Sequence, residues 1–275
     1  MYIDNKRKNI SNDKRRSAAE QLHLYKIFGD HRELKWAILS DIHGNLEAFK
    51  AVLDFISRED ILKLAFLGDA VGYGANPNEC VDIIKDRADV FIAGNHDYAV
   101  TGLTDVSSFN PVARTAIEWT KEQLTYSNRS FLSGLSLIDN KDDFTFVHST
   151  PCNPQNWDYL FSLSDVIKGF NFYHNRICFT GHSHIPAVFI KDNEGSVYPS
   201  GSLTVHLREG FRYIINVGSI GQPRDGISEA AFGICDTKES VFTLKRVPYD
   251  IATAQKKIIE AGLPEYLARR IAIGV

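Results

Sequence analysis

Residues 36–45 read WAILSDIHGN, an apolar run that passes directly into polar residues. A continuous apolar run such as Trp36–Leu39 is typical of a strand that is buried on both faces. Asp41 and His43 follow this run and stand two residues apart. Because side chains at i and i+2 share one face of a strand, both can reach one site beyond its end. This stretch therefore predicts a buried strand that delivers a carboxylate and an imidazole at its carboxyl end.

The same arrangement recurs four more times along the chain. Short apolar runs over residues 62–67, 90–93, 144–147 and 177–180 each end in Asp, Asn or His. In open α/β sheets the carboxyl ends of the strands form the ligand crevice, so we expect these polar side chains to meet. A lone Asp after a strand is usually a helix cap or turn former, but five such strand ends together favour a common site. The candidate residues are Asp41, His43, Asp69, Asn95, His148, His182 and His184.

Helical patterns separate the early apolar runs. Asn45 can cap one helix, Pro77 stands at the first position of a second, and residues 111–124 predict a third. Strand–helix alternation of this kind is typical of an α/β layered domain. Residues 186–246 show strand patterns without helices, which predicts an antiparallel second half of an α/β (α+β) fold. Two helical patterns between residues 250 and 273 close the chain.

The N-terminal residues differ from the rest of the chain. Residues 1–16 hold six Lys or Arg and almost no apolar side chains, and a helical pattern follows that Gly29 ends. We interpret residues 1–34 as a basic, helical extension that packs on the domain or on a sister subunit, which leaves a homo-oligomer open. A nucleic-acid-binding arm is the alternative, but no aromatic residues are interleaved with the basic ones. We expect residues 35–275 to form one domain.

The overall composition is that of an ordinary globular protein. The formal net charge of −3 argues against a surface built to bind nucleic-acid backbone. The four cysteines are widely spaced without a CxxC pair, so neither a zinc ribbon nor a disulfide framework is expected. No apolar run approaches the roughly 18–20 residues that cross a bilayer, and the basic N-terminus lacks the apolar core of a secretory signal. We therefore expect a cytoplasmic protein with neither a membrane nor a nucleic-acid partner.

The candidate residues have the chemistry of a site for two metal ions. Imidazole and carboxylate ligands without thiolates suit Mn, Fe, Zn, Ni and Co, and argue against a structural zinc site. The seven side chains are too many for one tetrahedral ion. Two ions that share a carboxylate would use them all, and Asp69 can bridge because each of its oxygens can bind one ion. We expect two divalent transition-metal ions, with Mn first among them.

In order and in strand context, these residues resemble the signature of the calcineurin-like metallophosphoesterases. The resemblance covers about residues 36–225, and residues 41–48 and 217–224 are similar to small bacterial and archaeal members of its phosphodiesterase-like branch. It implies a four-layer α-β-β-α sandwich, with two mixed sheets flanked by helices. It also assigns Asp41, His43, Asp69 and His184 to one metal, and Asp69, Asn95, His148 and His182 to the other. The motifs are Asp-x-His at 41–43, Gly-Asp at 68–69, Gly-Asn-His-Asp at 94–97, His148, and Gly-His-x-His at 181–184.

One segment departs from the protein phosphatases of this family. Those enzymes follow Gly-Asp with a segment that ends in Asp-Arg-Gly, whose arginine helps to hold the phosphate. Here Gly72 and Tyr73 stand in place of the Asp-Arg pair. The protein-phosphatase reading therefore loses weight, and other residues must hold the phosphate. The candidates are Asn45 at a helix N-terminus, Asn95, His96, Arg224 and Tyr73 itself.

The resemblance also suggests how the catalytic residues would act. A hydroxide held between two metals about 3.5–4 Å apart would attack phosphorus in line. His96 follows a predicted metal ligand, so we expect it to protonate the leaving oxygen or to donate a hydrogen bond to it. Asp97 either orients His96 or caps the next helix. Asn153, Trp157 and Tyr159 occupy a loop that either contacts the substrate or shapes the pocket.

Four functions remain open. A phosphodiesterase or phosphatase on small or nucleotide phosphoesters fits the missing Asp-Arg-Gly best. A protein Ser/Thr phosphatase and a dinucleoside polyphosphate hydrolase would use the same metal site. A non-catalytic protein-binding scaffold of this fold is the alternative from another class. That alternative predicts eroded metal ligands, whereas every predicted ligand and His96 are present.

Overall fold

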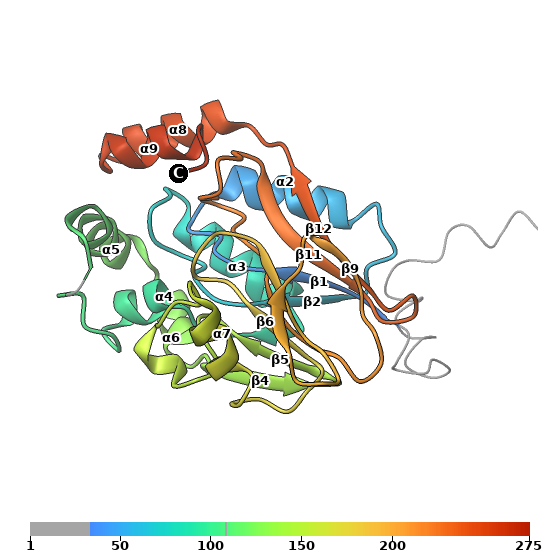
Figure 1. The fold of residues 1–275 in the computed structure, drawn as a ribbon. Helices are drawn as coiled ribbons and strands as arrows, with labels where there is room; N and C mark the ends of the chain where they lie inside the picture. Colours follow the sequence, from blue (N-terminus) through green and yellow to red (C-terminus); the bar gives the residue numbers. More distant parts are fainter. Residues whose placement is uncertain (1–33, 108) are drawn as a thin grey trace, which may run out of the picture.

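The computed structural model describes residues 34–107 and 109–275 (Figure 1). The N-terminal extension predicted over residues 1–34 lies outside this part of the chain, apart from Leu34. Two six-stranded sheets pack against each other, and helices cover their outer faces. The predicted four-layer α-β-β-α sandwich is therefore confirmed. Within the described residues, no helix is long and apolar enough to span a membrane.

The first sheet is mixed. Its first three strands in spatial order run parallel, and the others are antiparallel to their neighbours. The strand predicted over residues 90–93 ends at residue 91, two residues before the end of the apolar run. In spatial order the strands are β3 (Val90–Phe91), β2 (Lys63–Phe66), β1 (Lys35–Leu39), β11 (Ala230–Asp236), β12 (Val241–Val247) and β9 (Thr204–His206).

The second sheet is mixed as well. Three central strands run parallel, and antiparallel strands flank them on both sides. Both halves of the sandwich thus bring parallel strand ends to the edge where the polar motifs follow. In spatial order the strands are β4 (Ile138–Lys141), β5 (Phe144–Val147), β6 (Ile177–Thr180), β10 (Arg212–Asn216), β7 (Ala187–Lys191) and β8 (Val197–Pro199).

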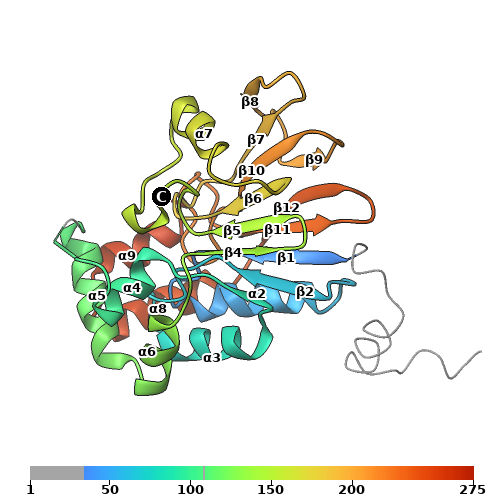
Figure 2. The same cartoon turned by 90° about the horizontal axis from the view of Figure 1, so that it is seen from below.

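Helices form the two outer layers (Figure 2). The side chains of α2, α3 and α8 lie on the side of the first sheet, and Val166 of α7 packs on the second. The predicted helix at 111–124 is present as α5, whereas the short helices α6 and α7 were not predicted. The helices are α2 (Leu46–Ile56), α3 (Pro77–Arg87), α4 (Asn95–Thr101), α5 (Pro111–Gln123), α6 (Tyr126–Ser133), α7 (Leu163–Gly169), α8 (Ile251–Glu260) and α9 (Glu265–Ile271), with a 3-10 turn at Pro154–Asn156.

Strand β1 shows why its apolar run is continuous. Trp36 and Ile38 pack into the core between the sheets, while Ala37 and Leu39 pack toward the helices. Alternate residues point to opposite faces of a strand, so a strand buried on both faces needs apolar residues at every position. The interior between the sheets is aromatic, with the ring of Phe179 5.9 Å from that of Phe146 and nearly parallel to it.

We expect Phe179→Ala to lower the free energy of unfolding by about 3–5 kcal/mol. Phe179 is fully buried and contacts the rings of Phe144, Phe146 and Phe242, so its removal leaves a cavity between the sheets. Urea denaturation would measure the loss. Tyr126→Ala is the matched control, because Tyr126 is 89% exposed and its removal should change stability by about 0.5 kcal/mol or less. Equal losses in the two variants would contradict this picture of the core.

Candidate metal centre

The predicted ligands follow the carboxyl ends of parallel strands, most of them in loops and Asn95 at the first position of α4. Five of them, Asp41, His43, Asp69, His182 and His184, have a left-handed backbone, with φ between 50° and 65°. A non-glycine residue in this conformation is strained, although Asp and His adopt it more readily than most. Such strain persists where the surrounding contacts over-determine it, and it concentrates at functional sites. The loops are therefore built to aim these side chains.

Each of the four predicted histidine ligands bonds a backbone carbonyl through one ring nitrogen. A carbonyl oxygen only accepts, so the nitrogen that faces it carries the proton. In a neutral ring the other nitrogen is then an acceptor, which is how metal-binding histidines are usually held. The bonds are His43 Nδ1 to Val71 O (3.0 Å), His148 Nδ1 to Leu67 O (2.8 Å), His182 Nε2 to Trp157 O (2.8 Å) and His184 Nδ1 to Gln222 O (2.6 Å).

The remaining acceptor atoms face one another at short range. His43 Nε2 and His184 Nε2 are 3.1 Å apart, and His184 Nε2 is also 3.1 Å from Asp41 Oδ1. Asp69 Oδ2 lies 3.6 Å from His43 Nε2 and 3.4 Å from His148 Nε2. Asp41 Oδ1 is buried and has no hydrogen-bond partner among the described residues. Buried acceptors without donors are unfavourable, so this arrangement fits bound cations.

The shifted pKa values of three of these histidines agree with a metal site. Burial and the charge of Arg224 lower the pKa of His184 to about 3, and burial and His148 lower the pKa of His182 to about 4. Burial would also lower the pKa of His148, but the carboxylates of Asp69 and Asp41 outweigh it and raise that pKa to about 9. Protons bound at such positions are released when a metal binds. The rings of His182 and His184 are therefore neutral and ready to act as ligands.

All seven predicted ligands come together. The ligand atoms of Asp41, His43 and His184 lie within 4.8 Å of one another, as do those of Asp41, Asp69 and His148. Asn95 Oδ1 is 3.3 Å from His148 Nε2, and the His182 ring centroid is 5.0 Å from that of His148. The set of nitrogen and oxygen donors fits two divalent ions that share Asp69.

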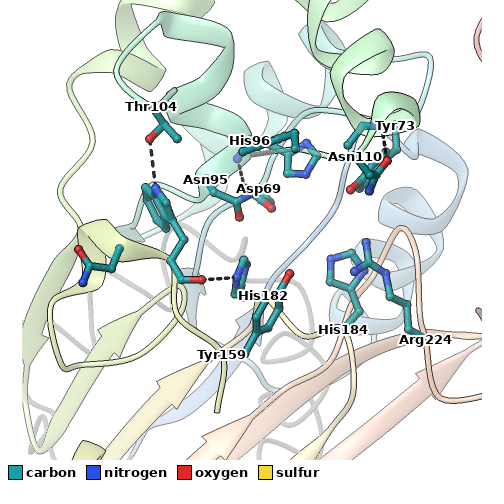
Figure 3. Close-up of a pocket in the computed structure, with 14 residues that line it drawn as sticks. Asp69, Tyr73, Asn95, His96, Thr104, Asn110, Tyr159, His182, His184 and Arg224 are labelled. Atoms are coloured by element: carbon teal, nitrogen blue, oxygen red, sulfur yellow. Dashed lines mark hydrogen bonds between the residues drawn. The ribbon is translucent and has the colours of Figure 1, made fainter. Parts of the chain in front are cut away.

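A pocket of about 270 Å³ opens above these residues (Figure 3). It has aromatic walls, and Arg224 is the one Lys or Arg among its described lining residues. The Arg224 side chain lies beside the Tyr73 ring and donates to Gln222 Oε1 at 2.8 Å. The lining residues are Asp69, Tyr73, Asn95, His96, Thr104, Phe109, Asn110, Ala113, Asn156, Trp157, Tyr159, His182, His184 and Arg224.

Gly72 and Tyr73 bring an aromatic ring against His96. Gly72 has a φ of +90°, and a Cβ at this position would overlap Nδ1 of His96. The Tyr73 ring centroid lies 4.5 Å from that of His96 and 4.6 Å from that of His43. Tyr73 thus fills the side of the pocket next to His96, at the position where the resemblance would place an arginine.

His96 and Asp97 have different surroundings. His96 lines the pocket, its backbone amide donates to Asp69 Oδ1 at 2.8 Å, and its Nδ1 is buried without a partner among the described residues. Asp97 accepts hydrogen bonds from the backbone amides of Gly94, Asp69 and Ala70. Of the two roles predicted for Asp97, these contacts are those of a helix cap. They also join the segment at Gly94 to the loop that carries Asp69.

The structure places some sequence candidates elsewhere. Asn45 caps α2 by accepting from the amide of Ala48 and donates to the carbonyl of Gly221, and it is not among the described residues that line the pocket. Its amide is therefore already used in holding two segments together.

The pocket also has walls that residue type alone does not mark. Trp157 and Tyr159 line it, but Asn153 from the same loop does not. Thr104, Phe109 and Asn110 also line the pocket and were not predicted. The one sequence feature that marks them is Asn110 before Pro111, which is typical of a helix start. In the structure the Asn110 side chain caps α5 by accepting a hydrogen bond from the amide of Ala113.

Comparisons with known proteins identify relatives of this chain. A family model described as the calcineurin-like phosphoesterase superfamily domain matches residues 34–240. An uncharacterized protein of Methanocaldococcus jannaschii is 43% identical over 244 residues, which cover 86% of this chain and 97% of that protein.

Solved structures match over most of the chain as well. A metallophosphoesterase from Sphaerobacter thermophilus is 37% identical with a TM-score of 0.78, over 88% of this chain and 100% of that one. A hypothetical protein from Pyrococcus horikoshii OT3 has a TM-score of 0.72 at 20% identity, over 88% of this chain and 99% of that one. At that identity the second match speaks for the fold alone.

We expect Gly94→Ala to disrupt the centre, because the added Cβ would overlap the Asp69 carboxylate and its backbone amide. Overpacking at a rigid site costs about 1–3 kcal/mol. Thermal melting would measure the stability, and metal content after equilibration with Mn²⁺ would measure the site. Gly201→Ala is the control, since nothing lies within 4 Å of a Cβ there. A Gly94→Ala protein with unchanged melting and metal content would show that this contact is unimportant.

Proposed function

The chain belongs to the calcineurin-like phosphoesterase superfamily, and from that premise we propose that it is a two-metal phosphodiesterase acting on small or nucleotide phosphoesters. One observation carries the proposal. The acceptor nitrogens of His43 and His184 face each other at 3.1 Å beside the unpartnered Oδ1 of Asp41. Cations bound between these acceptors would remove the cost of burying them without donors.

The ligands divide between two ions in this proposal. Asp41, His43, Asp69 and His184 would hold the first, whereas Asp69, Asn95, His148 and His182 would hold the second. When bound, the ions activate the attacking water and neutralise charge on the phosphoryl group. Mn is the metal we propose, with Fe, Zn, Ni and Co as alternatives, because the donors are nitrogen and oxygen alone.

The pocket lining supports a phosphodiester as the substrate. A diester carries one negative charge at its phosphate, and Arg224 is the single guanidinium among the described lining residues. Four aromatic side chains, those of Tyr73, Phe109, Trp157 and Tyr159, surround the same space and suit the organic groups of a small diester. A protein Ser/Thr phosphatase has less support, because Tyr73 occupies the position of its phosphate-binding arginine.

His96 would act on the leaving group. It lines the pocket next to Asn95, and burial holds the pKa of its imidazole well below the usual range. A neutral imidazole donates a hydrogen bond to the leaving oxygen, which is the second of the two roles predicted from sequence. Arg224 and Asn95 would hold the other phosphoryl oxygens.

Three further points remain proposals. A cytoplasmic location is supported by the four cysteines, which are all free and buried. A homo-oligomer and a dinucleoside polyphosphate substrate stay open. The protein-binding scaffold has little support, because it predicts eroded metal ligands and every predicted ligand is present in the sequence.

Purified protein should bind two transition-metal ions per chain and hydrolyse bis-p-nitrophenyl phosphate only with metal present. Asp41→Asn and His184→Ala should each lower kcat/KM by at least about 100-fold, since the first removes the negative charge of a ligand and the second removes a ligand. Metal analysis and initial rates measure both effects. Asp54→Asn and His174→Ala are the matched controls, because both side chains are exposed and far from the motifs. Full activity in metal-free protein would refute the proposal.

His96→Ala should affect poor leaving groups most. A group that stabilises the leaving oxygen contributes about 10²–10⁴-fold, and nitrophenolate needs little of that help. We therefore expect a loss of at least about 100-fold with alkyl diesters and a much smaller one with nitrophenyl diesters. His206→Ala, at an exposed histidine outside the motifs, should change neither. Equal losses with both classes of substrate would exclude this role for His96.

A further inference from the structure

Trp157 connects the two sides of the pocket. Its indole Nε1 donates to Thr104 Oγ1 at 3.1 Å, and Thr104 belongs to the segment between α4 and α5 (Figure 3). Its backbone carbonyl accepts from His182 Nε2 at 2.8 Å. One residue therefore contacts the opposite wall through its side chain and a predicted metal ligand through its backbone.

The ring of Trp157 makes further contacts on the same side. It packs edge-to-face with Tyr98, at 5.8 Å and 86°, and lies 6.1 Å from the ring of His148 at 72°. His148 and His182 are the two histidines proposed for the second metal. The contacts of Trp157 thus reach both histidines of that ion, whereas no described contact joins it to His43 or His184 of the first.

The backbone at Trp157 needs an external anchor. Its φ of 58° is left-handed, a conformation that is strained for a bulky residue and that the neighbouring contacts must hold. The carbonyl of Trp157 can point at His182 only while this conformation persists. The Thr104 hydroxyl, more than 50 positions away in the chain, is the polar group that holds the indole in place.

The His182 ring also stacks on Tyr159, a contact that is less directional than a hydrogen bond. The ring of Tyr159 stacks on it at 4.1 Å and 17°, but stacking does not choose which nitrogen carries the proton. Tyr159 is also 41% exposed. The carbonyl of Trp157 alone selects the tautomer that leaves Nδ1 free as a ligand.

We propose that Trp157, anchored by Thr104, is a positioning residue for the second metal ion. The anchor keeps the Trp157 carbonyl on His182 Nε2, and this contact fixes the orientation and the tautomer of the ligand. The inference rests on the two-metal site proposed above. It adds that the segment between α4 and α5, outside every ligand motif, sets the affinity for one of the two ions.

The test is a calorimetric titration of the metal-free full chain with Mn²⁺. Thr104→Val and Trp157→Phe each remove the indole–hydroxyl bond and keep the backbone carbonyl. Each should weaken the second binding step by about fivefold to tenfold, the value of one hydrogen bond, and leave the first step unchanged. The double variant should lose no more than either single variant, because both remove the same bond. His182→Ala, which lacks a ligand, identifies the step that belongs to the second ion.

Controls separate positioning from a general effect on the fold. Thr101→Val removes a hydroxyl at the end of α4 that bonds Tyr98 O instead, so it should change neither step. The thermal melting of metal-free Thr104→Val should match that of the wild type. An unchanged second step, equal weakening of both steps, or additive losses in the double variant would overturn the inference. A wild-type chain that binds no metal would instead refute the two-metal proposal itself.

Discussion

Mutual repulsion among buried acceptors is the constraint around which this protein is organised. Two imidazole nitrogens, those of His43 and His184, lie 3.1 Å apart next to a buried carboxylate oxygen of Asp41. No proton donor of the described residues separates them, so they need cations. The left-handed loops, the backbone carbonyls behind each ring and the glycines around Asp69 all hold these groups at that distance. Ligand geometry, rather than the hydrophobic core, explains why these loops accept strain.

The sandwich fold holds these ligand groups in position. Each sheet contains three adjacent parallel strands, and their carboxyl ends bring ligands from both sheets to one edge. Hydrogen bonds join loops of the two sheets there: the amide of Gly221 donates to the carbonyl of Asp41, and the amide of His182 donates to the Asp41 carboxylate. The core between the sheets is dense with aromatic rings, so the edge is a rigid platform.

Gly72 and Tyr73 distinguish this pocket from that of the related protein phosphatases. A side chain at Gly72 would collide with His96, so its absence lets the imidazole reach the pocket. Tyr73 then packs against both His96 and His43, and the Arg224 side chain lies beside the Tyr73 ring. An aromatic wall with one guanidinium favours a substrate of low charge with organic groups on both sides of phosphorus.

The sequence alone determined the buried strands, because local apolar runs indicate strands that are buried on both faces. It also determined the candidate ligands, because they follow these runs directly in the sequence. It did not reveal β4, α6 or α7, which are short and largely polar. Only the tertiary structure decided which polar residues were already occupied, such as Asn45 in its cap, and which distant segments form the walls. The reason is physical: Thr104 and Trp157 meet through packing between loops, and no local pattern encodes a contact of that range.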